Sequence, residues 1–409
     1  MNMALPILIA VIGVLLIWCA IWLVRTRRRT PHGGGWTSLA VAGLVVVAMS
    51  ACATGPVPDP TPAPLPPPAP PSQPLRPVAY WQRVFDDEAS GLDAQSRPLS
   101  RSSDSWDFYP LAYSVDAFTS MFEATGESRY ADVALDYVEG MVASARPSSS
   151  FSGRGFGDRY LGWVSPQRGV SQEVPLYESY CWRYATRLLR MLRGSPLYQV
   201  PAYRERYERL LAFAETDIFE KWYTRGVDEF IYRSRTHMAA HWAQIALDLS
   251  MLTTNDARRA RYREVVRNID DRLRAQFHLS RAEPAAYLWS DVWGEACDGG
   301  HEKSDCQDVS HGNGVISYIV EARDVNGAWS AEDIARFSRT FTAFVLGADG
   351  RHPEYVDGTG RGNGWIADGF AKLGRSSPAV QAVLQNYGVQ NAQYHAAMAV
   401  NAKMLGPNG

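Results

Sequence analysis

Apolar residues recur at spacings of three and four over most of the chain after about residue 80, which is the pattern of amphipathic helices. One helix face, for example, carries Leu111, Val115, Phe118 and Phe122. Gly126 follows this run and provides a helix end. The same spacing predicts helices over residues 109–125, 128–141, 177–193, 202–222, 236–253, 256–277, 311–324, 330–346 and 392–405, with a further pair inside 363–387.

These helices form successive hairpins, a loose repeat with a period of about 50 residues. Connections within a hairpin are short, whereas those between hairpins (148–175, 279–308 and 347–362) are long, glycine-rich and aromatic. The alternation predicts an all-α fold in which hairpins curl into an (α/α) toroid, an incomplete or six-hairpin barrel with inner and outer helices. A superhelical stack is the other packing that the hairpins permit. In a toroid the long loops gather at one end, where function is often located.

Two apolar runs precede the helical part. Residues 4–24 are uncharged and long enough to span a bilayer, and arginines follow within 25–29. The second run, 36–51, ends in Met-Ser-Ala before Cys52, which resembles a bacterial lipobox with a lipidated cysteine. Either translation starts near Val24 and leaves a lipoprotein signal, or the two runs form a membrane hairpin with cytoplasmic arginines. Both alternatives anchor the protein in the membrane of the bacterial cell envelope, facing the periplasm or the exterior.

Proline occupies almost every second position of residues 56–77. Such a stretch cannot form a core and acts as an extended spacer. We therefore divide the chain into a membrane or lipoprotein signal region at 1–52, a Pro-rich linker at 53–78 and a helical domain at 79–409.

Composition narrows the partners and the chemistry. The formal net charge is -2, which gives no support for a nucleic-acid partner. Cys297 and Cys306 flank a polar loop, and in an exported protein they can form a disulfide. A zinc site is the alternative, but it needs further ligands at close spacing. The sequence carries no phosphate-binding loop and no Gly-x-Ser-x-Gly elbow, and we predict neither a metal nor a cofactor.

Three segments resemble the (α/α) toroid enzymes of carbohydrate metabolism, most of all alginate lyase-type polysaccharide lyases. They are residues 122–132 (FEATGESRYAD), 308–314 (DVSHGNG) and 364–374 (GWIADGFAKLG). The first and third look like the helix-hairpin turns of many toroid families, so they bear on the fold more than on the reaction. The resemblance implies an acidic polysaccharide as substrate. The adjacent Asn-His pair usual in these lyases is absent here.

The segment 308–314 is the most informative for chemistry. Asp308 or Ser310 can cap a helix, which would place His311 and Asn313 in its first turn. Helix N-termini favour anions, so this turn could hold a uronate carboxylate. The alternative is a capped helix whose histidine bonds a neighbouring loop.

His237 and His241 are four residues apart and share one helix face, just after Arg235, which is a candidate for substrate binding. They are candidates for proton transfer in a cleft that receives acidic sugars. The alternative is one buried and one exposed histidine. Their helix lacks the glutamate of a zinc-protease motif.

Further candidates lie at the same predicted end of the fold. Glu178 and Tyr180 begin an inner helix and are candidate acid–base residues, although Glu178 could instead complement the helix dipole. The remaining candidates are expected to bind substrate or simply to pack in the fold: Arg154, Arg159, Tyr355, Trp365 and Trp289.

Three functions remain open. The first is β-elimination at a uronate, which needs a neutralised carboxylate, a base and an acid, and no cofactor. The second is glycoside hydrolysis, which needs two carboxylates across one cleft, from Glu178, Asp291 and Asp308. The third is a non-catalytic glycan-binding envelope protein.

Overall fold

The computed structural model describes residues 74–152, 156–166, 172–297, 305–325, 327–347, 352–362, 366–388 and 391–406. The chain divides into two compact units, Met1–Ala63 and Pro64–Gly409, and all described residues belong to the second. Cys52 and both apolar runs therefore lie outside the described residues, as does almost all of the linker. Within the described ranges, no helix is both long and apolar enough to cross a membrane.

The described part of the chain is mostly helical, which confirms the all-α prediction. Its principal helical elements are α2 (Val78–Leu99), α3 (Phe108–Thr125), α4 (Ser128–Ser144), α5 (Pro175–Arg193), α6 (Pro201–Phe213), η5 (Ala214–Glu220), α7 (Lys221–Phe230), α8 (Thr236–Leu252), α9 (Asp256–Gln276), α10 (Val309–Asp324), α11 (Ala331–Thr340), η6 (Phe341–Val345), η7 (Phe370–Ser376), α12 (Pro378–Leu384) and α13 (Ala392–Leu405). Short 3-10 turns are η1 (Ser105–Asp107), η2 (Ser148–Ser150) and η4 (Pro196–Gln199). Two antiparallel ribbons lie in the loops: β1 (Arg146–Pro147) with β2 (Leu161–Gly162), and β3 (His278–Leu279) with β4 (Tyr287–Leu288).

Local sequence signals set several of the helix ends. Gly126 ends α3 with φ of 75°, a left-handed conformation that favours glycine. Asp308 caps α10, since its carboxylate accepts the backbone N–H of His311. Ser330 and Asp333 form a reciprocal capping box at the start of α11. Glu127 occupies the N-cap position of α4, and its side chain makes no capping hydrogen bond.

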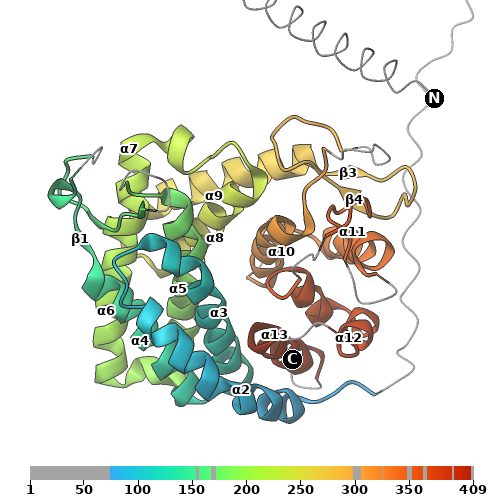
Figure 1. The fold of residues 1–409 in the computed structure, drawn as a ribbon, viewed down its shortest axis with the longest axis horizontal. Helices are drawn as coiled ribbons and strands as arrows, with labels where there is room; N and C mark the ends of the chain where they lie inside the picture. The colour runs from blue at the N-terminus through green and yellow to red at the C-terminus, as the bar shows by residue number, and fades with distance from the viewer. Residues whose placement is uncertain are drawn as a thin grey trace, which may run out of the picture. The chain divides into compact units, whose positions relative to one another are not determined.

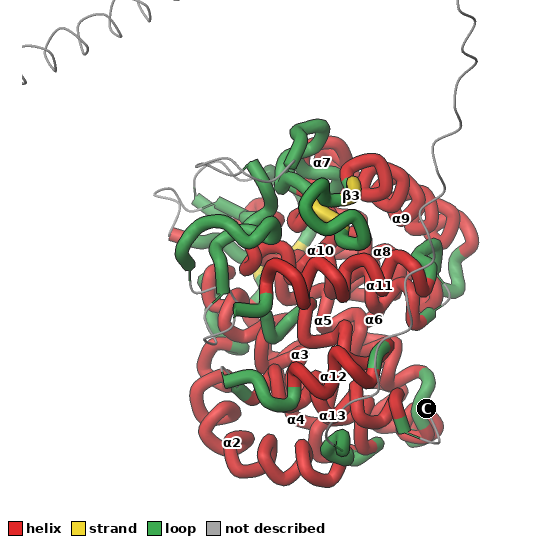
Figure 2. The backbone as a smooth tube through the Cα atoms, turned by 90° about the vertical axis from the view of Figure 1, so that its right-hand side faces the viewer, coloured by secondary structure: helices red, strands yellow, loops and turns green. Residues whose placement is uncertain are grey.

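Six elements pack one against the next in a closed cycle. Helix α3 contacts α5, α5 contacts α8, α8 contacts α10, α10 contacts η7, η7 contacts α13, and α13 returns to α3. Figure 1 shows the colour running round this cycle, so that α13 in red lies beside α2 in blue. The elements between them in the chain pack against them: α4 against α3, α6 against α5, α9 against α8, and α12 against η7. Figure 1 shows these four helices outside the cycle, and Figure 2 shows the same helices from the side.

Charged side chains are buried between the elements of this cycle. Glu321 of α10 accepts a hydrogen bond of 2.7 Å from Arg190 and lies 3.0 Å from the Nε of Arg187, both on α5. Arg183 of the same helix pairs with Asp368 at 2.6 Å. Such pairs persist in a low-dielectric interior only when their hydrogen bonds are satisfied, and removal of one partner is strongly destabilising. The network therefore fixes the positions of α5 and α10 relative to each other.

Three elements differ from the sequence prediction. The first helix of the pair expected inside 363–387 is a 3-10 helix, η7, which begins only at Phe370. Helix α2 was not predicted, because its buried side chains are few and include only Trp81 and Phe85 among the apolar ones. The helix predicted to end at residue 222 continues through η5 and α7 to Phe230, with a kink at Gly226 where φ is 149°. A glycine tolerates this backbone conformation, so the polar segment after Trp222 remains helical.

Candidate functional site

Three loop segments enclose a cleft of about 790 Å³ at one end of α8 and α10. Isolated β-bridges join them: Arg235 to Val292, Ser290 to Cys306, and Asp308 to Tyr355. These bridges join residues that are 57, 16 and 47 positions apart in the sequence. The charged and polar lining of the cleft includes Arg235, Asp291, Asp308, His311, Glu354, Tyr355 and Arg361.

His311 and Asp308 form an oriented pair on the cleft wall. The Nδ1 of His311 lies 2.8 Å from a carboxylate oxygen of Asp308, while the histidine side chain remains 52% exposed. The hydrogen bond to Asp308 raises the pKa of His311. Burial alone would raise the pKa of Asp308, but His311 holds it below its usual value. With Nδ1 engaged, Nε2 of His311 is the nitrogen left for a ligand.

His237 and His241 lie behind His311 on α8. The rings of His237 and His311 are 4.5 Å apart, and those of His237 and His241 are 6.2 Å apart. Burial, reinforced by the positive charge of His311, lowers the pKa of His237 to about 3. Burial also lowers the pKa of His241, and the charge of Arg183 adds to this effect. Neither Nδ1 has a hydrogen-bond partner within the described part of the structure, so two histidines of lowered pKa lie beside one of raised pKa.

Tyr180 extends this cluster from α5. Its ring packs edge-on against His241 at 5.1 Å and stacks on Tyr109 at 4.2 Å. Its hydroxyl donates to that of Tyr113 at 3.1 Å. Burial and the neighbouring Tyr113 raise the pKa of Tyr180 well above its usual value, so the phenol stays protonated and can serve as a proton donor. Four of the predicted catalytic residues are thus contiguous.

Arg235 and Tyr355, both predicted to bind substrate, line the same cleft. Arg235 is 45% exposed and forms an ion pair with Asp291 on the facing segment. Tyr355 stands beside Asp308 through the backbone bridge between them. These two residues lie where a ligand of His311 would also make contact.

Glu178 does not belong to this site. Its side chain is fully buried on the opposite face of α5, where its carboxylate lies 2.8 Å from Lys221 and accepts the indole N–H of Trp222 at 2.7 Å. Burial raises the pKa of Glu178, opposed by the charge of Lys221. The predicted acid–base role is replaced by a structural ion pair between α5 and α7, because the side chain faces the outer helix.

Two predicted ligand-binding residues are structural. The side-chain oxygen of Asn313, which is fully buried, accepts the backbone N–H groups of Gly369 and Phe370 at 2.8 and 3.1 Å. Asn313 therefore ties α10 to the start of η7. Trp289 is also fully buried, with its ring edge-on to Phe277 at 5.5 Å. Neither side chain is available to a sugar.

The other predicted residues are placed elsewhere. Arg159 lines a separate hollow with Tyr160 and Arg258, away from the cleft. Arg154 and Trp365 lie outside the described residues. The predicted disulfide is confirmed, since Cys297 and Cys306 are bonded at the edge of the cleft. Among the side chains that the structure describes, no group of three or more His, Cys, Asp or Glu could hold a metal.

Several residues of the site were not predicted from the sequence. Tyr113 and Arg183 contact or influence the reactive groups from inner helices that otherwise look like ordinary core. Asp308 was predicted to cap a helix, and the spacing of three to His311 was the signal for its second role as the partner of that histidine. No sequence pattern indicated Glu354 or Arg361, because only the tertiary fold places their loop at the cleft.

The chain matches no protein-family model, no curated protein and no solved structure. The described part of the chain defines a helical protein with a histidine–tyrosine cluster on α5, α8 and α10.

Proposed function

We propose that this chain is an envelope-anchored enzyme that cleaves a uronate-containing polysaccharide by β-elimination. The fold assigned in this proposal is an (α/α) toroid with six hairpins. Its support is the closed cycle of contacts through α3, α5, α8, α10, η7 and α13, with the intervening helices outside. A superhelical stack would leave its first and last inner helices apart, whereas α13 packs against α3.

In this proposal, His311 and Arg235 neutralise the carboxylate of the uronate. Elimination requires this step, because the proton next to a charged carboxylate is only weakly acidic. His311 carries a raised pKa and presents its free nitrogen to the cleft, and Arg235 lines the same wall. Asp291 and Asp308 already pair with these two cations, so their charges are balanced before substrate binds.

His237 acts as the base and Tyr180 as the acid. His237 is neutral and has an unpartnered Nδ1 within the described structure, so it can accept the proton next to the carboxylate. An anionic substrate beside it would raise its pKa and strengthen it as a base. Tyr180 stays protonated and can donate to the leaving oxygen. The observation that carries the proposal is this contiguity of His311, His237, His241 and Tyr180.

A polymeric substrate fits the extent of the hollowed surface. A second hollow of about 920 Å³ adjoins the cleft, and Arg361 and Gly362 line both. The combined surface has room for sugar units on both sides of the reacting one. Arg361 stands between the two hollows, where it can bind a second carboxylate of the chain.

Glycoside hydrolysis is the alternative, because Asp291 and Asp308 line the same cleft. Hydrolysis needs one carboxylic acid that stays protonated. Asp308 has a lowered pKa, which favours its carboxylate form, and Asp291 is engaged in an ion pair with Arg235. Elimination is therefore the better supported reaction.

The test uses the full-length chain in detergent with mannuronate- and glucuronate-containing polymers. Elimination creates unsaturated ends that absorb in the ultraviolet, whereas hydrolysis creates reducing ends without this absorbance. We expect the new absorbance with at least one polymer, and its loss in His311→Ala and His237→Ala. His395→Gln, on α13 beside Trp81, is the matched histidine control. Reducing ends without absorbance would establish the hydrolase, and binding without either product would establish a non-catalytic role.

A further inference from the structure

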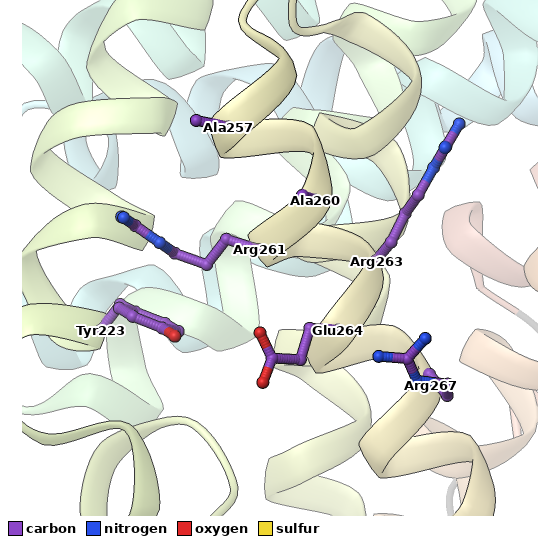
Figure 3. Close-up of a pocket in the computed structure, with 7 residues that line it drawn as sticks. All are labelled: Tyr223, Ala257, Ala260, Arg261, Arg263, Glu264 and Arg267. Atoms are coloured by element: carbon purple, nitrogen blue, oxygen red, sulfur yellow. The ribbon is translucent and has the colours of Figure 1, made fainter.

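A groove runs along the outer face of α9, remote from the cleft. It consists of two hollows of about 580 and 370 Å³ that share Ala257 and Arg261. Figure 3 shows the larger hollow, with Ala257 and Ala260 between Arg261 on one side and Arg263 on the other. The small alanine side chains leave space at the centre of this helix face. From Asn255 to Arg267 the groove follows α9 for about 18 Å.

Its lining is rich in arginine and tyrosine. The cationic and aromatic side chains that line it are Arg159, Tyr160, Tyr223, Arg258, Arg261, Arg263 and Arg267. Arg261 lies over the ring of Tyr223 at 4.8 Å and pairs with Glu220. Arg258 pairs with Glu215 at 2.6 Å. These two arginines are held in place by the fold.

Arg263 and Arg267 differ from these anchored arginines. They are exposed, four residues apart on α9, and neither forms an ion pair with any residue that the structure describes. Two unpaired guanidinium groups at this spacing lie on one side of the helix and can bind successive anionic groups of one ligand. Tyr160 lines the second hollow, where its ring can contact a sugar, whereas the ring of Tyr223 is covered by Arg261 and Phe219.

We propose that this groove is a second binding site for an acidic polysaccharide, outside the catalytic cleft. The identity of the polymer as the substrate rests on the proposed function. The arginines bind its carboxylates, and Glu264 inside the groove accepts hydrogen bonds from its hydroxyls. The hollow form of the groove favours a single polymer chain over a flat anionic membrane surface.

The test measures binding of the full-length chain in detergent to a mannuronate polymer, a glucuronate-containing polymer and a neutral glucan. The variant is Arg263→Gln with Arg267→Gln, and the charge-matched control is Arg83→Gln with Arg101→Gln, two exposed arginines outside the groove. We expect the groove variant to bind an acidic polymer about fivefold more weakly, since two exposed ion pairs together contribute about 1 kcal/mol. The control should bind like the parent, and raised salt should weaken the parent most.

Other outcomes would overturn the proposal. Unchanged affinity in the groove variant, an equal loss in the control, or an equal loss for the neutral glucan would each exclude a specific site. Weaker association with phosphatidylglycerol vesicles together with unchanged polymer binding would show a membrane contact instead. His311→Ala separates the two proposals: it should bind polymer through the groove even if no polymer is cleaved. The groove variant should still cleave short oligomers at the parental rate if the chain is a lyase.

Discussion

Replacing Asp308 by asparagine separates two roles of one side chain. Asparagine caps helices as well as aspartate does, so the hydrogen bond from the backbone N–H of His311 is retained. The charge that holds the imidazole is removed. We expect α10 to stay intact and the pKa of His311 to fall, because its hydrogen bond to the carboxylate is the largest cause of its raised value.

The stability effect has a defined size and pH window. A charge-assisted hydrogen bond contributes roughly 1.5–3 kcal/mol, but the His311 side chain is 52% exposed and solvent screening reduces this to about 1 kcal/mol. Because the pKa of His311 is raised, its contribution to the free energy of unfolding is present below about pH 6.5. This contribution is lost as the pH rises through the pKa of the folded state. Because the pKa of Asp308 is lowered, its contribution to the free energy of unfolding is present above about pH 4 and is lost at lower pH.

Denaturant unfolding at several pH values, together with an NMR titration of His311, tests this reasoning. Between about pH 4 and 6.5 the variant should be about 1 kcal/mol less stable than the parent, and above the folded pKa of His311 the two should converge. Asp333→Asn, in the capping box of α11, makes the same chemical change away from the cleft and is the control. An unchanged His311 pKa in Asp308→Asn would refute the pairing.

Three further predictions follow from the interior and the cleft. Glu321→Gln should lower the free energy of unfolding by about 3–5 kcal/mol in a urea titration, because it leaves several buried cations without their carboxylate; a loss below about 1 kcal/mol would contradict the network. Reducing the Cys297–Cys306 disulfide should lower Tm and polymer turnover, because closing this loop contributes roughly 2–3 kcal/mol to the free energy of unfolding. An unchanged Tm after thiol treatment would contradict this prediction. Gly314→Ala should lower turnover, since a Cβ there would lie 2.8 Å from Nε2 of His241 and displace the ring that packs between His237 and Tyr180; full activity would show that the packing of this histidine does not matter.

The helices and the reactive cluster were largely predictable, because each rests on a local pattern. The spacing of four between His237 and His241 fixes a shared helix face, and Asp308 three residues before His311 fixes a cap. Helix α13 occupies the predicted residues, since its apolar positions are regular and Asn391 caps it. These features need only the helical period and the chemistry of the cap.

The errors concern side chains whose role depends on which face meets which neighbour. Glu178 begins an inner helix, as predicted, but points outward to Lys221, and the sequence of α5 alone does not reveal where α7 will lie. Asn313 lies in the first turns of α10, as predicted, yet its amide bonds the backbone of η7, more than fifty residues away. Both residues are polar and buried, and burial of a polar group requires a partner that only the tertiary fold supplies.

The buried ion pairs also connect stability with the proposed chemistry. Arg183 donates to Asp368 in the interior, while its guanidinium lies 4.8 Å from the ring of Tyr180. Burial lowers the pKa of His241, and the charge of Arg183 lowers it further. One arginine thus joins α5 to the segment before η7 and helps to keep a neighbouring histidine neutral. Because a neutral imidazole can accept a proton and a protonated one cannot, burial together with this interior charge keeps His237 and His241 in the form that can act as a base.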